Sequence, residues 1–411
     1  MPVGIDDLNV YGSTLAVQSQ AIANARGVRV DDLERFGLVR RTLTPNFEDP
    51  VTLAANAARP LVDTYGKNAF DLLIVATESS IDDAKPVSAY VHKYLGLSER
   101  CFHLETKHAC FSATAALMLA ASWVETHPGS RALVIATDMA RRLFGLPAAV
   151  AKIASGAEVA EGAGAVAMAI TATPRVLEFE PHRGFAAREV YDVRRPSRVL
   201  EIADPELSLA AYLDLLELSW AQYADAAGGK PLEELAYLVF HTPLVGLVQH
   251  AHRVLVELHE ELSPTEISTH FERHVRPSVQ YAQELGNIYS GSLFAALASL
   301  IDQVAEFPQG ARVGLFSYGS GSCASFFSGK IGEEAKAIVG RHRIAHHLAA
   351  RRIVDVRTYE GIVLETERGL TDAVFVPTPN LVPGLYDEAY RGQRRLVLEG
   401  VDDYYRSYAW A

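Results

Sequence analysis

Short runs of β-branched and aliphatic residues, each ending abruptly in polar residues, constrain the fold of this chain more than any other feature. Three of them are residues 72–78, 132–138 and 163–170. Apolar runs of this length are typical of strands buried on both faces of a sheet. Such a sheet needs helices on both sides. The runs therefore predict an α/β fold built in layers.

Segments with the helical spacing of apolar residues alternate with these strands. The clearest, 112–125, stops at His127, Pro128 and Gly129, because proline and glycine together end a helix. After about residue 171 the same order recurs, with helices near 207–226, 245–261 and 290–304 and strands near 236–240 and 312–317. This order predicts two similar halves, 1–170 and 171–411, the second with a C-terminal extension from about residue 332.

Composition agrees with a compact chain and disfavours several kinds of partner. Of the 411 residues, 49% are hydrophobic and 21% charged, which is ordinary for a globular protein. The formal net charge of −12 disfavours nucleic acid and anionic membranes as partners. The apolar stretches fall short of the ~20 residues that span a bilayer, and no signal-peptide pattern opens the chain. We therefore expect a cytoplasmic protein with neither nucleic-acid nor membrane partners.

Three cysteines, Cys101, Cys110 and Cys323, form an odd set without metal-ligand spacing, which fits a reducing compartment. Cys110 differs from the others because it comes directly before an Ala-rich helix. Free N–H groups and the helix dipole at such a position stabilise a thiolate and lower the pKa of a cysteine. Cys110 is therefore a candidate nucleophile; the alternative is a small buried cysteine in a core helix.

Two further candidates follow strands directly. Glu78 ends the first apolar run, where partial burial raises a carboxyl pKa toward neutrality and suits a general base. His241 follows the strand 236–240, where it can exchange protons or polarise a carbonyl. The alternatives are a solvated carboxylate and a structural histidine. Asp138 ends a sister strand in the same way and is expected to be structural.

Small and amide-bearing residues occupy two further turns. Asn287 lies in the Gly-flanked segment 286–292 before a helix, and Gly319, Ser320 and Gly321 follow a strand. The second turn predicts an oxyanion or phosphate cradle, with an ordinary small-residue turn as the alternative. Neither segment matches the GxxxxGK[ST] or GxGxxG patterns, so nucleotide binding is not predicted.

Two other patterns are weaker. Cys110, His241 and Asn287 come in the order of a papain-like protease, but the local sequence that surrounds the cysteine of such proteases is missing. Three histidines have a spacing that allows one helix face to hold a metal. Arginines lie among them, so a solvated basic helix is the prediction. These histidines are His342, His346 and His347. No metal site is expected.

Six segments taken together resemble the 3-hydroxy-3-methylglutaryl-CoA (HMG-CoA) synthase family, and the resemblance runs nearly end to end. They are residues 77–79, 108–114, 161–165, 240–243, 286–292 and 317–321. The resemblance implies an α/β thiolase fold, in which two pseudo-equivalent βαβαβαββ halves form a five-layered αβαβα body. It also implies assembly as a homodimer.

Further segments look more like the branch of this family that serves polyketide assembly lines. They are residues 4–12, 47–51 and 56–60, together with Gly246 at a position where mevalonate-pathway members have lysine. This branch adds an acetyl-derived unit to the β-keto group of a chain held on an acyl carrier protein (ACP). The implied partners are donor and acceptor ACPs, which deliver phosphopantetheine thioesters without a cofactor.

The resemblance also implies roles for single residues. Cys110 is the nucleophile, Glu78 the base, and His241 the group that polarises the ketone and protonates the alkoxide. Substrate binding is assigned to Asn287, Tyr289, Pro243, Gly319, Ser320 and Gly321. Docking of a carrier protein or its phosphopantetheine needs a basic patch despite the net charge of −12, and the candidates are Arg194, Arg195 and Arg253, with Arg141 and Arg142. Phe111, His108 and Cys323 depart from the family pattern and bear on acceptor size and pocket polarity.

Three other functions remain open from the sequence. The first is a mevalonate-pathway HMG-CoA synthase using acetyl-CoA and acetoacetyl-CoA. The second is a decarboxylative or acyl-transferring ketosynthase of the same fold, which does not need Glu78. The third is a catalytically silent scaffold that binds carrier proteins, a function that does not need the catalytic residues.

Overall fold

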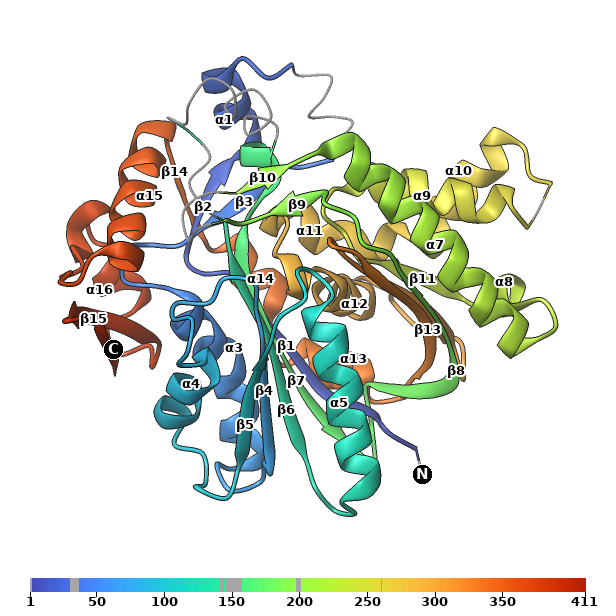
Figure 1. Cartoon of the computed structure of the whole chain (residues 1–411), viewed down its shortest axis with the longest axis horizontal. Coiled ribbons are helices and arrows are strands. Elements are labelled where there is room, and N and C mark those ends of the chain that lie inside the picture. The colour runs from blue at the N-terminus through green and yellow to red at the C-terminus, as the bar shows by residue number, and fades with distance from the viewer. Residues whose placement is uncertain (1, 30–36, 141–143, 145–156, 197–200, 260) are drawn as a thin grey trace.

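The computed structural model describes residues 2–29, 37–140, 144, 157–196, 201–259 and 261–411 (Figure 1). Strands and helices alternate through most of this length, so the predicted α/β class is confirmed. Arg141 and Arg142, two of the predicted carrier-protein contacts, lie outside the described residues.

A nine-stranded mixed sheet organises the molecule, in the order β11-β12-β13-β8-β1-β7-β6-β4-β5. Its strands are β1 (Gly4–Tyr11), β4 (Leu72–Ala76), β5 (Phe102–Thr106), β6 (Ala132–Met139), β7 (Ala163–Thr171), β8 (Leu177–Ala187), β11 (Tyr237–Phe240), β12 (Arg312–Gly319) and β13 (Cys323–Ile331). The three apolar runs of the sequence are β4, β6 and β7, and every residue in these strands is buried. Their burial on both faces explains why they lack an alternating pattern.

The two ends of the sheet repeat one arrangement. β4 lies parallel to β6, which is antiparallel to β7, and β7 is antiparallel to β1. In the same way, β11 lies parallel to β12, which is antiparallel to β13, and β13 is antiparallel to β8. The two parts meet where β1 pairs with β8 through Gly4 with Glu178 and Ile5 with Leu177. Because one sheet is continuous across this junction, a division into domains near residue 170 stays a prediction.

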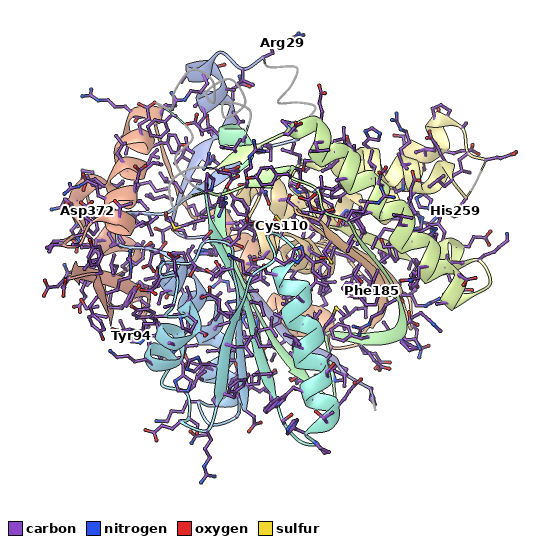
Figure 2. The ribbon with its side chains drawn as sticks, in the orientation of Figure 1. Arg29, Tyr94, Cys110, Phe185, His259 and Asp372 are labelled. Atoms are coloured by element: carbon purple, nitrogen blue, oxygen red, sulfur yellow. The ribbon has the colours of Figure 1, made fainter. Side chains whose placement is uncertain are left out.

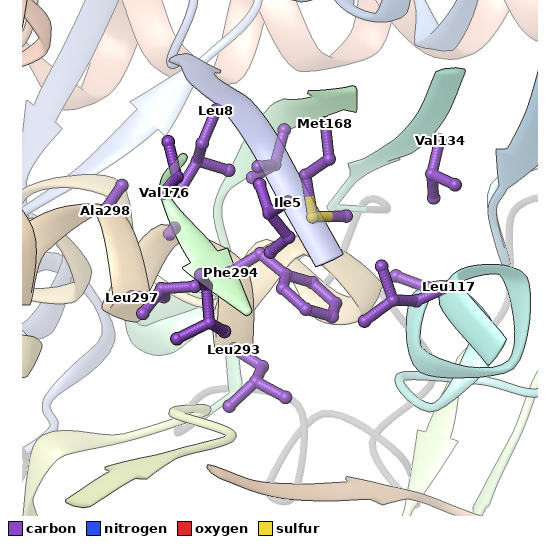
Figure 3. Close-up of a cluster of buried hydrophobic side chains, with 14 of the residues drawn as sticks. Ile5, Leu8, Leu117, Val134, Met168, Val176, Leu293, Phe294, Leu297 and Ala298 are labelled. Carbon is purple, nitrogen blue, oxygen red and sulfur yellow. The ribbon is translucent and has the colours of Figure 1, made fainter. Parts of the chain in front are cut away.

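Helices form three layers around the two parts of the sheet. They are α3 (Pro50–Tyr65) and α4 (Val87–Leu95) on one outer face, α5 (Ser112–Thr126) and α12 (Ser292–Gln303) in the centre, and α7 (Pro205–Ala227) and α9 (Val245–Glu257) on the other outer face. The central layer packs against β1, β6 and β7 on one side (Figure 3). On the other side it packs against β11 to β13. Residues 292–301 of α12 are all buried, as expected of a helix enclosed on every side.

The α5 helix needs separate mention because of its hydropathy. Within the described residues, the stretch Ala109–Thr126 has the length and apolar composition of a membrane span, and half of it is buried inside the fold. Its buried face carries Ala113, Ala116 and Leu117 into the central core. The core helix of a compact protein meets the same length and hydropathy criteria.

Smaller elements complete the described chain. They are β2 (Leu15–Gln18), α1 (Ser19–Arg26), β3 (Arg40–Leu43), β9 (Val193–Arg194), β10 (Ile202–Ala203), α8 (Pro231–Glu234), α10 (Pro264–His274), α11 (Gln280–Leu285), α13 (Ala335–Gly340), α14 (Ile344–Ala349), β14 (Arg352–Val354), α15 (Val356–Thr371), α16 (Leu385–Ala389), β15 (Leu396–Asp402) and β16 (Tyr405–Trp410), with short 3-10 helices η1 (Arg276–Val279), η2 (Tyr289–Gly291) and η3 (Pro379–Leu381).

The C-terminal extension packs over the core and is anchored to α3. The Asp49 side chain caps α3 and accepts hydrogen bonds from Arg406 Nη1 at 3.0 Å and Tyr408 Oη at 2.7 Å. Asn56 on the same helix donates to the Leu396 carbonyl at 3.1 Å and accepts from the Leu396 N–H at 2.7 Å. These buried polar contacts fix the last hairpin, β15 with β16, against the first half of the chain.

The expected solvated basic helix around His342, His346 and His347 is wrong for two of the three histidines. His342 lies before α14, and its buried side chain places Nε2 within hydrogen-bond distance of Asp7 Oδ1, at 2.8 Å. The His347 ring stacks on Tyr11 with the centroids 5.0 Å apart, and only His346 is exposed. Local arginine content misled the prediction, because the buried partners come from the distant strand β1.

Candidate active site

A tight turn before α5 presents Cys110 near the centre of the molecule (Figure 2). Ala109 has a left-handed backbone with φ of 41°, which reverses the chain just before the cysteine. Ser112 stabilises the turn, because its hydroxyl donates to the Ala109 carbonyl at 2.6 Å and accepts from the His108 N–H at 2.7 Å. The turn therefore places Cys110 two residues before α5 begins at Ser112.

The thiol of Cys110 lies against the predicted base. Its Sγ is 3.4 Å from Glu78 Oε1, a distance that allows an S–H···O hydrogen bond. Glu78 follows β4 and Cys110 follows β5, and these parallel neighbours end at the same edge of the sheet. The structure thus brings together the two residues that the sequence singled out at separate positions.

Asp138, expected to be structural, holds this edge of the site together. Its Oδ1 accepts from the Glu78 N–H at 2.8 Å and from Thr77 Oγ1 at 3.0 Å. Its Oδ2 accepts from the Ser290 N–H at 3.2 Å and from the Ser290 hydroxyl. One buried carboxylate therefore joins the end of β4, the end of β6 and η2.

The electrostatic environment gives Glu78 and Cys110 unusual proton affinities. Burial, with added repulsion from Asp138 and Glu201, raises the pKa of Glu78 to about 7, while Arg195 opposes the increase. Burial and the neighbouring Glu78 carboxylate also raise the pKa of Cys110 well above its usual value. This finding reverses the lowering that the helix N-terminus predicts, because loss of hydration outweighs the dipole. The thiol therefore needs a base, and Glu78 is in contact with it.

His241 lies at the end of β11, on the other part of the sheet. Its side chain is almost completely buried. Its backbone N–H donates to the Phe316 carbonyl at 2.7 Å, and its backbone carbonyl accepts from Tyr212 Oη at 2.8 Å. Burial lowers the pKa of His241 to about 3, so the ring is neutral near pH 7. Nδ1 has no hydrogen-bond partner within the described structure. The hydrogen bonds of the described residues do not link His241 directly to Cys110 or Glu78.

The predicted glycine turn between β12 and β13 packs against the nucleophile turn. A Cβ on Gly319 would lie 2.5 Å from the Phe111 backbone nitrogen and 2.8 Å from the His108 carbonyl oxygen, so only glycine fits there. The Gly321 N–H already donates to Asp192 Oδ1 at 3.1 Å and is not available to an oxyanion. Ser320 lines the cleft and remains the candidate donor of this turn.

Asn287 is fixed before η2 by its backbone and by its side-chain oxygen. Its N–H donates to the Ala160 carbonyl at 2.8 Å, and its Oδ1 accepts from the Tyr289 N–H and from Ser292 Oγ, both at 2.9 Å. Because Oδ1 is occupied, the amide can offer Nδ2 as a donor to a ligand. The Tyr289 ring lies under the Arg195 guanidinium, 4.7 Å from centroid to Cζ.

A cleft of about 450 Å³ opens beside Glu78, and cationic side chains gather around it. It is lined by Glu78, Ser80, Asp83, Lys107, His108, Ala109, Val193, Arg194, Arg195, Pro196 and Ser320. Of the predicted catalytic and substrate-binding residues, Glu78 and Ser320 line this cleft. The other predicted residues are not part of this lining; they are Cys110, His241, Pro243, Asn287, Tyr289, Gly319 and Gly321. The mix of carboxylate, cations and a hydroxyl suits a polar thioester substrate with a phosphate on its carrier arm.

The predicted carrier-protein arginines lie in three different environments. Arg194 lines the cleft, and its guanidinium lies 4.5 Å over the Tyr191 ring. Arg253 lies on α9, outside the cleft lining, with 54% of its side chain exposed and Glu257 as an ion-pair partner at 4.0 Å. Arg195 is 89% buried, since only 11% of its side chain is exposed, and it contacts Glu78 and Glu201. Nothing in the local sequence distinguishes Arg195 from Arg194, because the burial depends on distant elements.

The described residues also bear on metal binding. Among them, no group of three or more His, Cys, Asp or Glu side chains has an arrangement that could hold a metal ion. Cys101 is buried at the start of β5 and Cys323 begins β13, and neither is part of the cleft lining.

Comparison with solved structures identifies the class of the fold. The curacin biosynthetic pathway HMG synthase, solved in complex with acetyl donor-ACP, superposes with a TM-score of 0.94 at 35% identity over 100% of both chains. The layered body, the repeated sheet and the cysteine before the central helix define an acyl-transferring, carbon–carbon bond-forming enzyme of thiolase fold. The predicted fold class is thereby confirmed.

Sequence comparison identifies the family. The family descriptions "Hydroxymethylglutaryl-coenzyme A synthase N terminal" and "C terminal" match residues 1–174 and 261–410. The polyketide biosynthesis 3-hydroxy-3-methylglutaryl-ACP synthase PksG of Bacillus subtilis is 35% identical over 99% of both chains. Hydroxymethylglutaryl-CoA synthase of Enterococcus faecalis is 31% identical over 89% of this chain and 92% of its own. The chain belongs to the HMG-CoA synthase family.

Proposed function

We propose that this enzyme is a 3-hydroxy-3-methylglutaryl-ACP synthase of polyketide β-branching. It takes an acetyl group from a donor ACP and adds it to the β-ketone of a β-ketoacyl chain on an acceptor ACP. The relation to PksG over the whole chain supports the carrier-protein substrates. The contact between Cys110 Sγ and Glu78 Oε1 carries the chemistry, because it places a nucleophile and a base of suitable proton affinity together. A cytoplasmic homodimer is part of the same proposal.

The first step is acetyl transfer to the enzyme. Glu78, whose pKa is raised to about 7, accepts the proton of the Cys110 thiol. The thiolate attacks the carbonyl carbon of the acetyl thioester, and the bond between that carbon and the donor sulfur breaks. The donor thiolate leaves with a proton returned from Glu78. Glu78 is then a carboxylate again beside the acetyl-S-enzyme.

The second step makes the carbon nucleophile. Glu78 removes a proton from the acetyl methyl group, which is acidic because a thioester withdraws electrons from its α-carbon. Negative charge develops on the acetyl oxygen. The Cys110 N–H and the Ser320 hydroxyl are the proposed donors that stabilise it.

The third step joins the two chains and frees the product. The enolate carbon attacks the acceptor ketone, while the neutral His241 donates its ring proton to the emerging alkoxide. The proton that Glu78 took from the acetyl methyl group then replaces the one lost by His241, so Glu78 is again a carboxylate. Asn287 Nδ2 holds the acceptor thioester carbonyl. Water then attacks the enzyme thioester, the carbon–sulfur bond breaks, and the Cys110 thiol is restored beside a 3-carboxymethyl-3-hydroxyacyl product. These steps use side chains and thioesters alone.

The experiment that tests this proposal is intact-protein mass spectrometry after brief incubation with acetyl-ACP or, separately, with acetyl-CoA. We expect an added acetyl group that depends on Cys110 and forms much faster from acetyl-ACP; Cys110→Ala is the control. Fast acetylation from acetyl-CoA would support a mevalonate-type synthase instead. Absence of acetylation from either donor would leave the scaffold, or an enzyme for another acyl group. The acyl chain, whether acetyl or propionyl, is read from the mass added.

A further inference from the structure

Arg195 occupies a place that its predicted role in carrier binding does not explain. Its Nη1 donates to the Glu78 carbonyl at 3.0 Å and to Ser79 Oγ at 3.4 Å. Its Nε lies 3.9 Å from Glu78 Oε2 and forms a close ion pair with Glu201. One guanidinium therefore contacts both the main chain and the carboxylate of the proposed base.

The fold fixes this guanidinium from both sides. The short strands β9 and β10 pair antiparallel, with Ile202 opposite Arg194, so Arg195 and Glu201 are brought together at one end of the ribbon. On its other side the guanidinium stacks on the Tyr289 ring. Both Arg195 and Glu201 are almost fully buried. These contacts hold the Arg195 side chain inside the protein, so it is not free to bind a carrier protein at the surface.

The charges around Glu78 make this cation unusual. Three acidic or titratable side chains face Glu78. They are Asp138 on β6, Cys110 in the turn before α5 and Glu201 in the β9–β10 ribbon. Glu161 is also buried, and it interacts with Arg195, Glu201 and Tyr289. Among the described groups that act on the Glu78 carboxylate, Arg195 is the cation, and Asp138 and Glu201 are acidic. Without it several buried carboxyl groups would repel one another, and burial would favour their neutral forms.

We propose, building on the proposed function, that Arg195 is a positioning residue: it holds the Glu78 carboxylate against Cys110 and keeps it ionised, while Glu201 limits that effect. The hydrogen bond from Nη1 to the Glu78 carbonyl fixes the position of Glu78. The nearby Nε stabilises the negative charge on Oε2. Arg195 itself takes no part in bond making.

The test compares two variants with opposite expected effects. Single-turnover condensation by pre-acetylated enzyme is measured against pH for Arg195→Gln and Glu201→Gln. A general base must be deprotonated, so loss of the cation moves the acid limb to higher pH, by about one pH unit. Loss of the Glu201 charge moves the limb to lower pH. Arg195→Lys keeps the charge and should restore part of the profile. Arg391→Gln, which removes an exposed arginine paired with Asp387, is the control and should leave the profile unchanged.

A second readout does not depend on any acyl substrate. Alkylation of Cys110 by iodoacetamide is followed against pH, because it reports when the thiol beside Glu78 loses its proton. Arg195→Gln should move the rise in alkylation rate to higher pH. If the wild-type enzyme is acetylated by no donor yet this shift is seen, the proposed function fails and the role of Arg195 stands.

Two results would overturn the proposal for Arg195. One is loss of rate in both variants at every pH without a shift of either profile, which indicates a structural role alone. The other is a shift of both variants in the same direction. Thermal unfolding of each variant establishes that the protein is folded, and if Arg195→Gln is not, Arg195→Lys and Glu201→Gln decide the question.

Discussion

Glu78 is the residue on which the proposed chemistry depends most. Replacing it with alanine should lower the condensation rate about 10²–10⁴-fold, the usual contribution of general base catalysis. Acetyl transfer should be slowed less than condensation, because the variant loses the base of the thiol but also the negative charge that opposes the Cys110 thiolate. Mass spectrometry measures acetylation, and product release from acceptor ACP measures condensation. Near-normal condensation by Glu78→Ala would show that another group is the base.

The proton affinity of Glu78 predicts a pH dependence. Its raised pKa of about 7 means that the carboxyl group is protonated, and inactive as a base, below that pH. Condensation should therefore fall about tenfold for each pH unit below 7. Rates from pH 5 to 9 at constant ionic strength check this, and an acid limb near 4.5, the ordinary glutamate range, would contradict the buried site.

His241 should give no step of its own in that profile. Burial lowers its pKa to about 3, so the ring stays neutral throughout the working range and can only donate its N–H proton. His241→Ala should reduce condensation about 100-fold or more and leave Cys110 acetylation intact. If acetylation is lost as well, His241 acts on the thiol instead of the ketone.

The sequence predicted the proximity of Glu78 and Cys110 better than the proton affinity of the Cys110 thiol. Strand ends and a helix start indicated Glu78, His241 and Cys110, because chemistry-bearing residues gather at those positions in α/β folds. The sign of the Cys110 pKa shift could not be predicted, because it depends on burial by distant segments. The same holds for Arg195, whose partners become neighbours only when the chain folds.

At the scale of elements, the β12–β13 turn is the most sensitive contact of the site. Gly319→Ala would place a methyl group against the Phe111 backbone, so we expect loss of activity and a lowered melting temperature. Gly361→Ala is the matched control. That glycine is exposed inside α15 with open space around it, and alanine should stabilise the helix by about 0.5–1 kcal/mol. Calorimetry of both variants tests the pair, and an unaffected Gly319→Ala would mean that the turn can move.

Elements buried on both sides were the easiest to predict. β4, β6 and β7 show continuous apolar runs. The outer helix predicted at 207–226, which buries only one face, is observed as Pro205–Ala227. The histidine segment around His342 was not predictable from its own residues. Its surroundings come from Asp7, over three hundred residues earlier in the chain.

At the scale of the whole molecule, stability depends on how the C-terminal extension is anchored. Arg406 and Asp49 form a buried pair, and removal of one buried partner costs about 3–5 kcal/mol. We expect Arg406→Ala to lower the free energy of unfolding by about that amount in a denaturant titration. Arg391→Ala, which removes an exposed pair with Asp387, should change it by less than about 1 kcal/mol. Equal effects of the two variants would show that the anchor contributes little.

The position of Asp138 has a consequence for the order of events during folding. Its carboxylate joins Thr77 and Ser290, which are more than two hundred residues apart in the chain. The edge of the sheet that carries Glu78 is therefore complete only after η2, which is translated late, has packed against Asp138. Newly made protein should thus show its secondary structure before it gains activity, and a nascent chain that ends before η2 should be inert toward acyl donors.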